Sequence, residues 1–336
     1  MIVQCHIRNI FKYPIFTRYM ANMAKKVEIS VVIPAYNEQE NVGILYRKLK
    51  PVLDRLRKKY EIIYVDDGST DKTFDVLVQI HKKDKSVKVI KFRKNFGQTA
   101  AFDCGFKQAV GDIIITIDAD LQNDPEDIPN LLSKLNQGYD VVSGWRVKRN
   151  DTLMKKLTSK FSNFLRRAIT GDNIHDSGCS LKAYRRECFK DLDLYGEMHR
   201  YIPSILLWKG FKITEIPVKH YSRKFGSSKY SFTRLFKGFL DLIIVKFWMQ
   251  YSTRPIHLFG FFGIIFSIFG FIIGAYLTFI KFFEGMKISN RPLLLFCILL
   301  ILLGAIFIVF GILADIMIKI YYKDDIKTYN IEKELV

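Results

Sequence analysis

The chain has 336 residues, enough for one sizeable domain with appendages, and 49% of them are hydrophobic, including 28 phenylalanines, so a substantial core is available. Its formal net charge of +19 indicates a partner of opposite sign, namely nucleic acid, anionic lipid headgroups or a phosphorylated substrate. The five cysteines are scattered without a CxxC pair, which excludes a disulfide framework or a zinc site and indicates reduced thiols in a cytosolic setting.

Residues 1–26 form an N-terminal extension that is basic and aromatic but lacks the continuous apolar stretch of a signal peptide. Met20 and Met23 stand just before the first expected strand. We interpret the extension as a mis-assigned start of translation, with a weak membrane-surface segment as the alternative.

From residue 27 onward, stretches typical of strands alternate with stretches typical of helices. The pattern predicts strands over 27–37, 61–67, 87–92 and 112–118, separated by helices over 38–60, 71–83 and 98–110. Pro51 is expected to bend or interrupt the first helix, and Thr70 or Asp71 to cap the second. This alternation predicts an α/β fold with a mostly parallel, doubly wound sheet.

Three polar clusters directly follow predicted strands, at residues 34–38, 66–71 and 118–122. Ligands of such sheets bind beyond the carboxyl ends of the strands, so these clusters are candidates for one site. The chain has neither a GxGxxG fingerprint nor a GxxxxGK[ST] loop, and a nucleoside diphosphate would therefore need a metal to neutralise it. Asp and Gln oxygens suit Mg²⁺ or Mn²⁺. The alternative for the carboxylates of segment 118–127 is a solvated loop that begins a helix.

Two apolar runs near the C-terminus, 256–280 and 292–318, are each long enough to cross a bilayer. The segment 223–254 before them is rich in Lys and Arg, which places the N-terminal part in the cytoplasm by the positive-inside rule. Residues 152–169 and 231–247 have apolar side chains at helical spacing on a basic background. We expect both segments to be helices that lie in the membrane interface, with ordinary core helices as the alternative.

The order of the motifs is similar to that of a known family. The motifs are VVIPAYNEQENV, EIIYVDDGSTD, RKNFGQTAA, DADLQNDPEDIP, SGWRVKR, DSGCSLKAYRRE, HYSRKFGSSKYSFTRLFKGFLDL and RPIHLFGFFG. From about residue 27 to 320, the chain resembles the membrane-anchored family 2 glycosyltransferases that load a sugar onto a polyprenyl phosphate, such as dolichyl-phosphate mannose synthases and bacterial undecaprenyl-phosphate glycosyltransferases. One departure is Asp124, where the family often has a further proline.

The resemblance implies a GT-A catalytic domain, a nucleotide-sugar donor, a polyprenyl-phosphate acceptor and Mg²⁺ or Mn²⁺. It also implies roles for particular residues: donor binding by Pro34, Tyr36, Glu38, Asp67 and Asp118; metal binding by Asp118, Asp120 and Gln122; diphosphate or acceptor-phosphate binding by Arg146, Arg149, Arg223 and Lys229; and a catalytic role for Asp176. The domains would be a GT-A domain over 27–222 that includes the interfacial helix 152–169, a basic loop and interfacial helix over 223–254, two spans within 255–320, and a tail over 321–336.

Several of these residues have simpler interpretations. Asp176 would act as a base, position the acceptor or stabilise positive charge at the anomeric carbon, or else be a turn residue before Gly178. A lipid phosphate is already largely ionised at neutral pH, so a strong base is less necessary. Glu38 has the alternative of a first-turn helix acid, and Asp66 is expected to stabilise a turn. The position of His175 next to Asp176 is weak support for a catalytic His–Asp pair. Whether His220 contacts phosphate is left undecided.

The function that the resemblance implies is metal-dependent, inverting transfer of a sugar from a nucleotide sugar to an undecaprenyl-phosphate type of acceptor, for modification of cell-envelope glycans. A UDP-sugar is expected, because GEMHRYIP and RPIHLFG look closer to the bacterial branch; GDP-mannose transfer is the alternative. The protein would be integral to the cytoplasmic membrane, with a homo-oligomer as an open possibility. One alternative is a non-catalytic membrane protein that binds lipid phosphate. A polysaccharide synthase is a second, but the sequence has no QxxRW motif. A nucleic-acid-binding protein is a third, but no nucleic-acid-binding module is recognisable.

Overall fold

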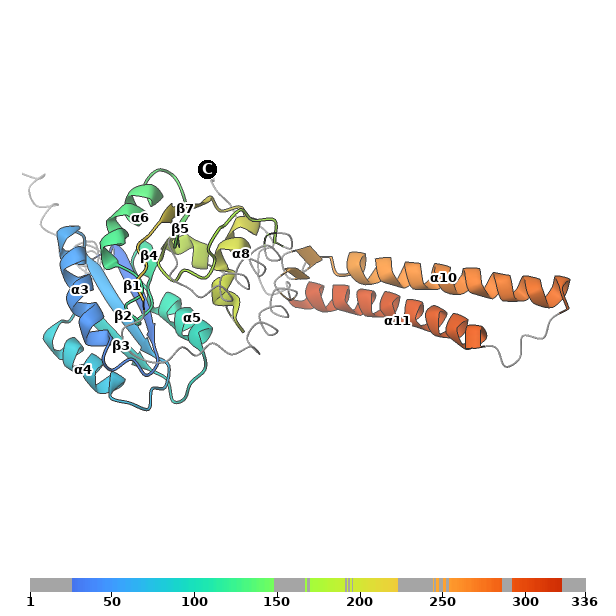
Figure 1. Ribbon diagram of the computed structural model, residues 1–336, viewed down its shortest axis with the longest axis horizontal. Helices are drawn as coiled ribbons and strands as arrows, with labels where there is room; N and C mark the ends of the chain where they lie inside the picture. The colour runs from blue at the N-terminus through green and yellow to red at the C-terminus, as the bar shows by residue number, and fades with distance from the viewer. Residues whose placement is uncertain are drawn as a thin grey trace, which may run out of the picture. The chain divides into compact units, whose positions relative to one another are not determined.

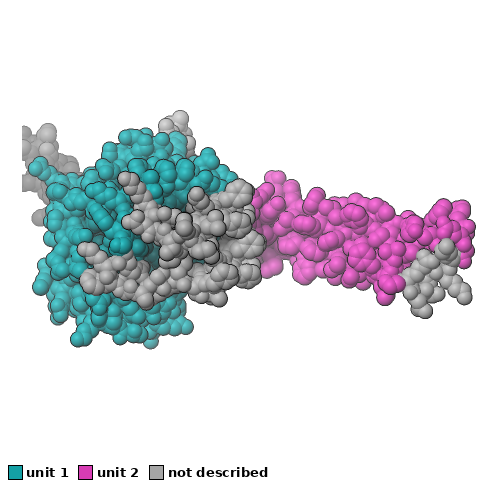
Figure 2. Space-filling view, in the orientation of Figure 1, with its two compact units in different colours: residues 1–242 teal, residues 243–336 magenta. Residues whose placement is uncertain are grey.

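A computed structural model describes residues 26–147, 167, 170–190, 192, 194, 196–222, 244, 246–247, 250–251, 254–285 and 292–321. The chain divides into two compact units, residues 1–242 and 243–336, which are teal and magenta in Figure 2. Apart from Arg167, the predicted interfacial helix 152–169 lies outside the described residues, and only parts of the second one, 231–247, are described.

The first unit is built on a seven-stranded sheet with the strand order β3-β2-β1-β4-β6-β5-β7. The strands are β1 (Ile29–Ala35), β2 (Tyr60–Asp66), β3 (Val87–Lys91), β4 (Ile113–Thr116), β5 (Val141–Trp145), β6 (Lys182–Arg185) and β7 (Ile213–Pro217). Only β6 runs antiparallel to its neighbours, β4 and β5. The expected α/β fold with a mostly parallel sheet is therefore confirmed.

Helices cover both faces of this sheet, which explains why the central strands are continuous apolar runs. All seven residues of β1 are buried. Figure 1 shows α3 (Val42–Arg55) and α4 (Thr73–Lys83) on one face and α5 (Gln98–Gln108) on the other. The remaining described helices of this unit are α6 (Ile128–Leu135) and α8 (Ile202–Trp208), with short 3₁₀ turns at Pro125–Asp127, Arg186–Phe189 and Met198–Arg200.

Two local predictions for the helices have different outcomes. Helix α3 continues through Pro51 without interruption, contrary to one expectation. Pro51 is exposed, so the carbonyl that loses its intrahelical donor can hydrogen-bond to water. The Asp71 carboxylate accepts hydrogen bonds from the backbone N–H of Thr73, at 2.9 Å, and from its hydroxyl. Asp71 therefore caps the start of α4, as the sequence predicted.

The parallel order of β2, β1 and β4 brings the polar clusters to one edge of the sheet. The three strands are adjacent and run in the same direction, so the loops that follow Ala35, Asp66 and Thr116 leave from the same edge. Pro34 fits within central strand β1 because the pairing of β1 with β4 ends at Val32–Thr116, before the proline would have to donate.

The second unit contains two long antiparallel helices, α10 (Ile256–Phe283) and α11 (Pro292–Tyr321), seen in Figure 1. Both are long and apolar enough to cross a membrane. They coincide with the predicted runs 256–280 and 292–318 and extend each by three residues at its end. Most large side chains on their outer surface are exposed, as expected for groups that face lipid.

The two helices approach closely at Gly263 and Gly304. A Cβ atom on Gly263 would lie 2.7 Å from Ile308 Cγ1 and 2.9 Å from the Gly304 carbonyl oxygen. A Cβ atom on Gly304 would lie 2.7 Å from the Gly263 carbonyl oxygen. Small residues allow such close backbone approach between membrane helices, where van der Waals contact drives association.

We therefore expect Gly263→Leu to separate α10 from α11 and to lower the thermal midpoint of the detergent-solubilised protein by several degrees. Gly260→Leu is the matched control, three residues away on the same helix, because a Cβ atom there meets only Ile256 of its own helix, at 3.9 Å. The prediction is checked by heating both variants and measuring the temperature at which each loses its folded peak in size-exclusion chromatography. Equal midpoints for the two variants would contradict it.

Candidate active site

Hydrogen bonds join the first two strand-end loops to each other. The backbone N–H of Asn37 donates to the Ser69 hydroxyl at 2.9 Å, and the Asn37 side-chain oxygen accepts from the backbone N–H of Thr70 at 2.9 Å. Asn37 has a φ of 54°, in the left-handed region that asparagine tolerates better than most residues. Backbone strain of this kind clusters at functional sites, which directs attention to these loops.

The second loop is joined to the segment that begins α5. Asp67, which is 3% exposed, accepts hydrogen bonds from the backbone N–H groups of Phe96, at 2.7 Å, and Gly97, at 2.9 Å. Gly68 is needed beside it, since its φ is +70° and a Cβ atom would lie 2.3 Å from the Lys94 carbonyl carbon. The predicted donor contact Asp67 therefore also fixes the loop that leads to Gln98.

The other predicted donor residues lie at the end of β1. Pro34 is buried in the strand, and Tyr36, partly exposed, is the first residue after it. The Glu38 carboxylate accepts a hydrogen bond from the Asn41 side chain at 2.5 Å, just before α3 begins. Asp66 accepts from the backbone N–H of Ser69 at 3.0 Å, which confirms the expectation that it stabilises a turn.

A pair of carboxylates follows β4, at the centre of this edge. Asp118 accepts a hydrogen bond from the Gln98 side-chain amide at 2.8 Å, and Asp120, 6% exposed, accepts from the backbone N–H of Gln122 at 3.1 Å. Leu121, between Asp120 and Gln122, has a φ of 64°, so the turn after Asp120 is tight. Desolvation, followed by repulsion from Asp120, raises the pKa of Asp118 to about 6. The two negative charges are therefore close enough to disfavour each other.

This donor set fits a hard divalent cation. Two carboxylates whose mutual repulsion a cation would relieve, together with the neighbouring Gln122 amide, supply the oxygen atoms that Mg²⁺ and Mn²⁺ prefer. Among the described residues, no group of three or more His, Cys, Asp or Glu side chains could hold a metal by itself. The remaining ligands would thus come from substrate phosphates and water, as is usual for Mg²⁺.

The second half of the acidic segment has a different role. Asp124 accepts from the backbone N–H of Glu126 at 3.1 Å and so caps the 3₁₀ turn that Pro125 begins. Glu126 pairs on the surface with Arg55. Asp127 accepts from the backbone N–H of Lys219 at 2.7 Å. These acids therefore cap and hold structural elements, whereas Asp118 and Asp120 remain the metal candidates.

An ion pair between Arg146 and Asp176 lies at the end of β5. The Arg146 Nε and Nη2 atoms donate to the two Asp176 oxygens at 2.6 and 2.8 Å, a bidentate arrangement. Both side chains are largely buried, at 14% and 6% exposed. The predicted phosphate ligand and the predicted catalytic acid thus contact each other, although thirty positions separate them in the sequence.

Two charged residues near this pair were missed by the sequence analysis. Lys182, at the start of β6, is 4% exposed and donates to the Ser177 carbonyl oxygen at 3.1 Å. Burial lowers its pKa, while the charges of Asp176 and Asp118 oppose that shift. Glu215 on β7 accepts from the backbone N–H groups of His175 and Asp176. A Glu in the middle of the mostly apolar strand β7 is a signal that could have identified Glu215.

Of the other predicted residues, some are placed and some are not. Gln122 lies beside Asp120, and its carbonyl oxygen accepts from the backbone N–H of Tyr221 at 2.9 Å. His175 stacks on Trp145, with ring centroids 4.5 Å apart, and His220 forms an isolated β-bridge with Asn123. Arg149, Arg223 and Lys229 lie outside the described residues.

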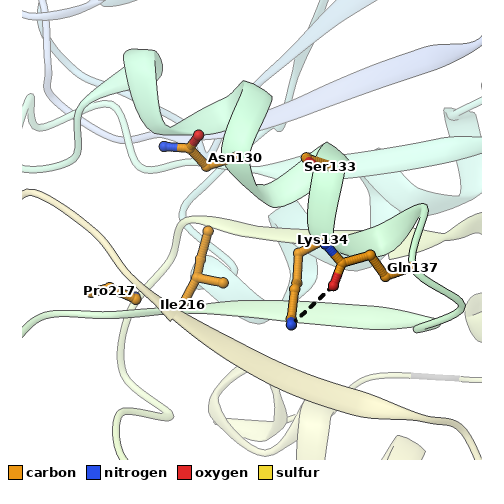
Figure 3. Close-up of a pocket in the computed structure, with 6 residues that line it drawn as sticks. All are labelled: Asn130, Ser133, Lys134, Gln137, Ile216 and Pro217. Carbon is orange, nitrogen blue, oxygen red and sulfur yellow. Dashed lines mark hydrogen bonds between the residues drawn. The ribbon is translucent and has the colours of Figure 1, made fainter.

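A shallow pocket of about 260 Å³ lies elsewhere, between α6 and the edge strand β7 (Figure 3). Its lining residues are Asn130, Ser133, Lys134, Gln137, Ile216 and Pro217. Figure 3 shows Asn130 and Ser133 of α6 above Ile216 and Pro217, with Lys134 hydrogen-bonded to Gln137, which follows the helix. The lining contains no carboxylate, histidine or thiol, so this pocket is a poor candidate for chemistry.

Comparisons with known proteins identify the family of this chain. The family model described as "Glycosyl transferase family 2" matches residues 30–193. A dodecaprenyl-phosphate galacturonate synthase of Rhizobium johnstonii is 39% identical over 316 residues, which cover 93% of this chain and 94% of that protein. An undecaprenyl-phosphate 4-deoxy-4-formamido-L-arabinose transferase of Salmonella choleraesuis is 38% identical over 304 residues, covering 90% and 91%.

Solved structures show the same fold. Glucosyl-3-phosphoglycerate synthase from Mycobacterium tuberculosis, in complex with Mn²⁺, uridine diphosphate and phosphoglyceric acid, superposes with a TM-score of 0.53 at 19% identity. The match covers 68% of this chain and 80% of that one. The fold is thus that of a GT-A glycosyltransferase.

The chain belongs to glycosyl transferase family 2. The resemblance that the motifs indicated is confirmed, since the relatives that match almost the whole chain are polyprenyl-phosphate sugar transferases by name. The expectation of an enzyme of this class is confirmed as well.

Proposed function

We propose that this enzyme transfers a sugar from a nucleotide sugar, a UDP-sugar, to the phosphate of a membrane polyprenyl phosphate of the undecaprenyl type. The observation that carries the proposal is the placement of the Asp118–Asp120 carboxylates and the Arg146–Asp176 ion pair at the same edge of the sheet. The carboxylate pair suits a metal-bound diphosphate, and the Arg146 guanidinium suits a second phosphate. The names of the relatives support the acceptor class.

Asp118, Asp120 and Gln122 would hold Mg²⁺ or Mn²⁺ beside the donor diphosphate. The ion would act as a Lewis acid and neutralise the charge that the leaving nucleoside diphosphate gains. Pro34 lies at the end of β1, and Tyr36, Glu38 and Asp67 lie in the loops after β1 and β2, where the nucleoside would bind. The uridine diphosphate and Mn²⁺ bound by the mycobacterial synthase of the same fold support this assignment.

Arg146 would bind a phosphate oxygen of the acceptor or the diphosphate, with Arg149, Arg223 and Lys229 as further cations. A planar guanidinium is suited to phosphate, and Asp176 fixes its orientation through two charge-assisted hydrogen bonds. The acceptor phosphate is the nucleophile and is already ionised at neutral pH, so no strong base is required. Direct attack on the anomeric carbon opposite the leaving diphosphate inverts the configuration of the sugar.

The helices α10 and α11 would anchor the enzyme in the cytoplasmic membrane. Their apolar length suits a bilayer core, and the basic segment before them favours a catalytic domain on the cytoplasmic side. A polyprenyl phosphate carries its phosphate at the headgroup level, within reach of an enzyme anchored there. Association of spans into a homo-oligomer is compatible with this arrangement.

A transfer assay tests the proposal. The full-length protein in nanodiscs, with Mn²⁺ or Mg²⁺ and undecaprenyl phosphate, is screened against a panel of UDP-sugars, with GDP-mannose and CDP-sugars included. The expected result is a lipid-linked sugar from one UDP-sugar. Transfer only from GDP-mannose would replace the donor assignment, and no turnover with any donor would contradict the proposed function.

A further inference from the structure

We propose that Glu215 is a positioning residue for the reaction, which acts by holding the turn that carries Asp176 and thereby orients the Arg146 guanidinium. The inference rests on the proposed function in one respect: Arg146 must act on a substrate phosphate. It assigns a role to the edge strand β7.

The Glu215 carboxylate binds the turn at three points. Its Oε2 atom accepts from the backbone N–H of His175, at 2.7 Å, and contacts the Nδ1 atom of the same residue, at 2.9 Å. Its Oε1 atom accepts from the backbone N–H of Asp176, at 3.1 Å. The side chain is 10% exposed, so these contacts are largely shielded from water.

The turn is also held from the two neighbouring strands. The His175 ring stacks on Trp145 of β5, and Lys182 of β6 donates to the Ser177 carbonyl oxygen at 3.1 Å. Residues 175–177 are therefore fixed by β5, β6 and β7 together. Because Asp176 binds both Nε and Nη2 of Arg146, a shift of the turn shifts the guanidinium with it.

The contacts at position 215 require a carboxylate. The two backbone N–H groups point at different oxygens of Glu215, and both oxygens of a carboxylate accept hydrogen bonds. A glutamine has one accepting oxygen, and its NH₂ group would face one of the two N–H groups. Glu215→Gln therefore keeps the shape of the side chain but forces the turn to move. A misplacement of about 1 Å at a reacting group can cost about 100-fold in rate.

Asp140 provides the matched control. It accepts from the backbone N–H of Lys212 at 2.8 Å, just before β7 begins, so it makes the same kind of contact near the start of that strand. Asp140→Asn removes one charge, weakens this contact and the 3.8 Å ion pair with Arg185, and leaves the turn at Asp176 untouched.

The test measures sugar transfer by the full-length variants in nanodiscs, together with their thermal midpoints. We expect Glu215→Gln to lower kcat/KM about 100-fold, Asp140→Asn to change it less than about threefold, and Glu215→Asp, which restores two accepting oxygens, to recover part of the loss. In an Arg146→Ala background, Glu215→Gln should have no further effect, because its target is already absent.

Equal effects of Glu215→Gln and Asp140→Asn would overturn the inference, as would an undiminished effect of Glu215→Gln in the Arg146→Ala background. If Glu215→Gln does not fold, Glu215→Asp is compared with Asp140→Asn in both backgrounds by the same criteria. Failure of the wild-type enzyme to transfer any sugar would contradict the proposed function instead, so the two failures are distinct.

Discussion

Asp120→Asn is expected to reduce sugar transfer by about 10³-fold or more while leaving folding and membrane insertion intact, since removal of one electrostatic contact of this kind typically costs 10²–10³ in kcat and a metal ligand more. The asparagine oxygen can still accept from the backbone N–H of Gln122, which preserves the tight turn at Leu121. The negative charge that would bind the cation is lost. Transfer rates over a range of Mn²⁺ concentrations measure the effect.

Glu126→Gln is the control for this variant. It removes one negative charge from the same segment, but Glu126 is exposed and pairs with Arg55, away from the strand end. Its activity should stay within about twofold of the wild type, because surface ion pairs contribute little. Loss of activity in both variants alike, or full wild-type transfer in excess chelator, would contradict the metal role of Asp120.

The sheet and the helical hairpin could be predicted because each is encoded locally. Ile113–Ile117 is an apolar run interrupted only by Thr116 and bounded by Asp112 and Asp118, which already indicates a strand buried on both faces. The runs that became α10 and α11 are long and apolar enough to cross a bilayer. In both cases the signal lies within one segment, so no knowledge of tertiary contacts was needed.

Contacts between distant segments could not be predicted in this way. The bonds from Phe96 and Gly97 to Asp67 depend on how the loop after β3 folds back over the loop after β2. The same is true of Glu215, which contacts residues 40 and 39 positions earlier in the chain. Side-chain type gives the capacity for such contacts, but the fold decides which partner lies within reach. Pro51 is the opposite case, in which a local signal misled. Proline was expected to bend or interrupt the helix, but α3 continues through it because water can hydrogen-bond to the carbonyl that loses its donor.

A double-mutant cycle on Arg146 and Asp176 should show that the two residues act as a unit. We expect Arg146→Ala to lower kcat/KM about 10³-fold and Asp176→Asn about 10²-fold. The double variant should be no worse than Arg146→Ala alone. The reason is that Asp176 contributes by orienting a guanidinium that the first substitution has already removed. The missing factor of about 100 corresponds to a coupling of about 2.7 kcal/mol.

Thermal midpoints of the same variants separate a catalytic loss from a folding loss. Either single substitution leaves a largely buried charge without its partner, which is strongly destabilising, whereas the double variant removes both charges. The double variant should therefore be at least as stable as Asp176→Asn while being less active. If Asp176 instead accepts a proton from the reacting groups, its loss adds to that of Arg146, and the double variant falls about 100-fold below Arg146→Ala. Additive losses would thus assign Asp176 to proton transfer.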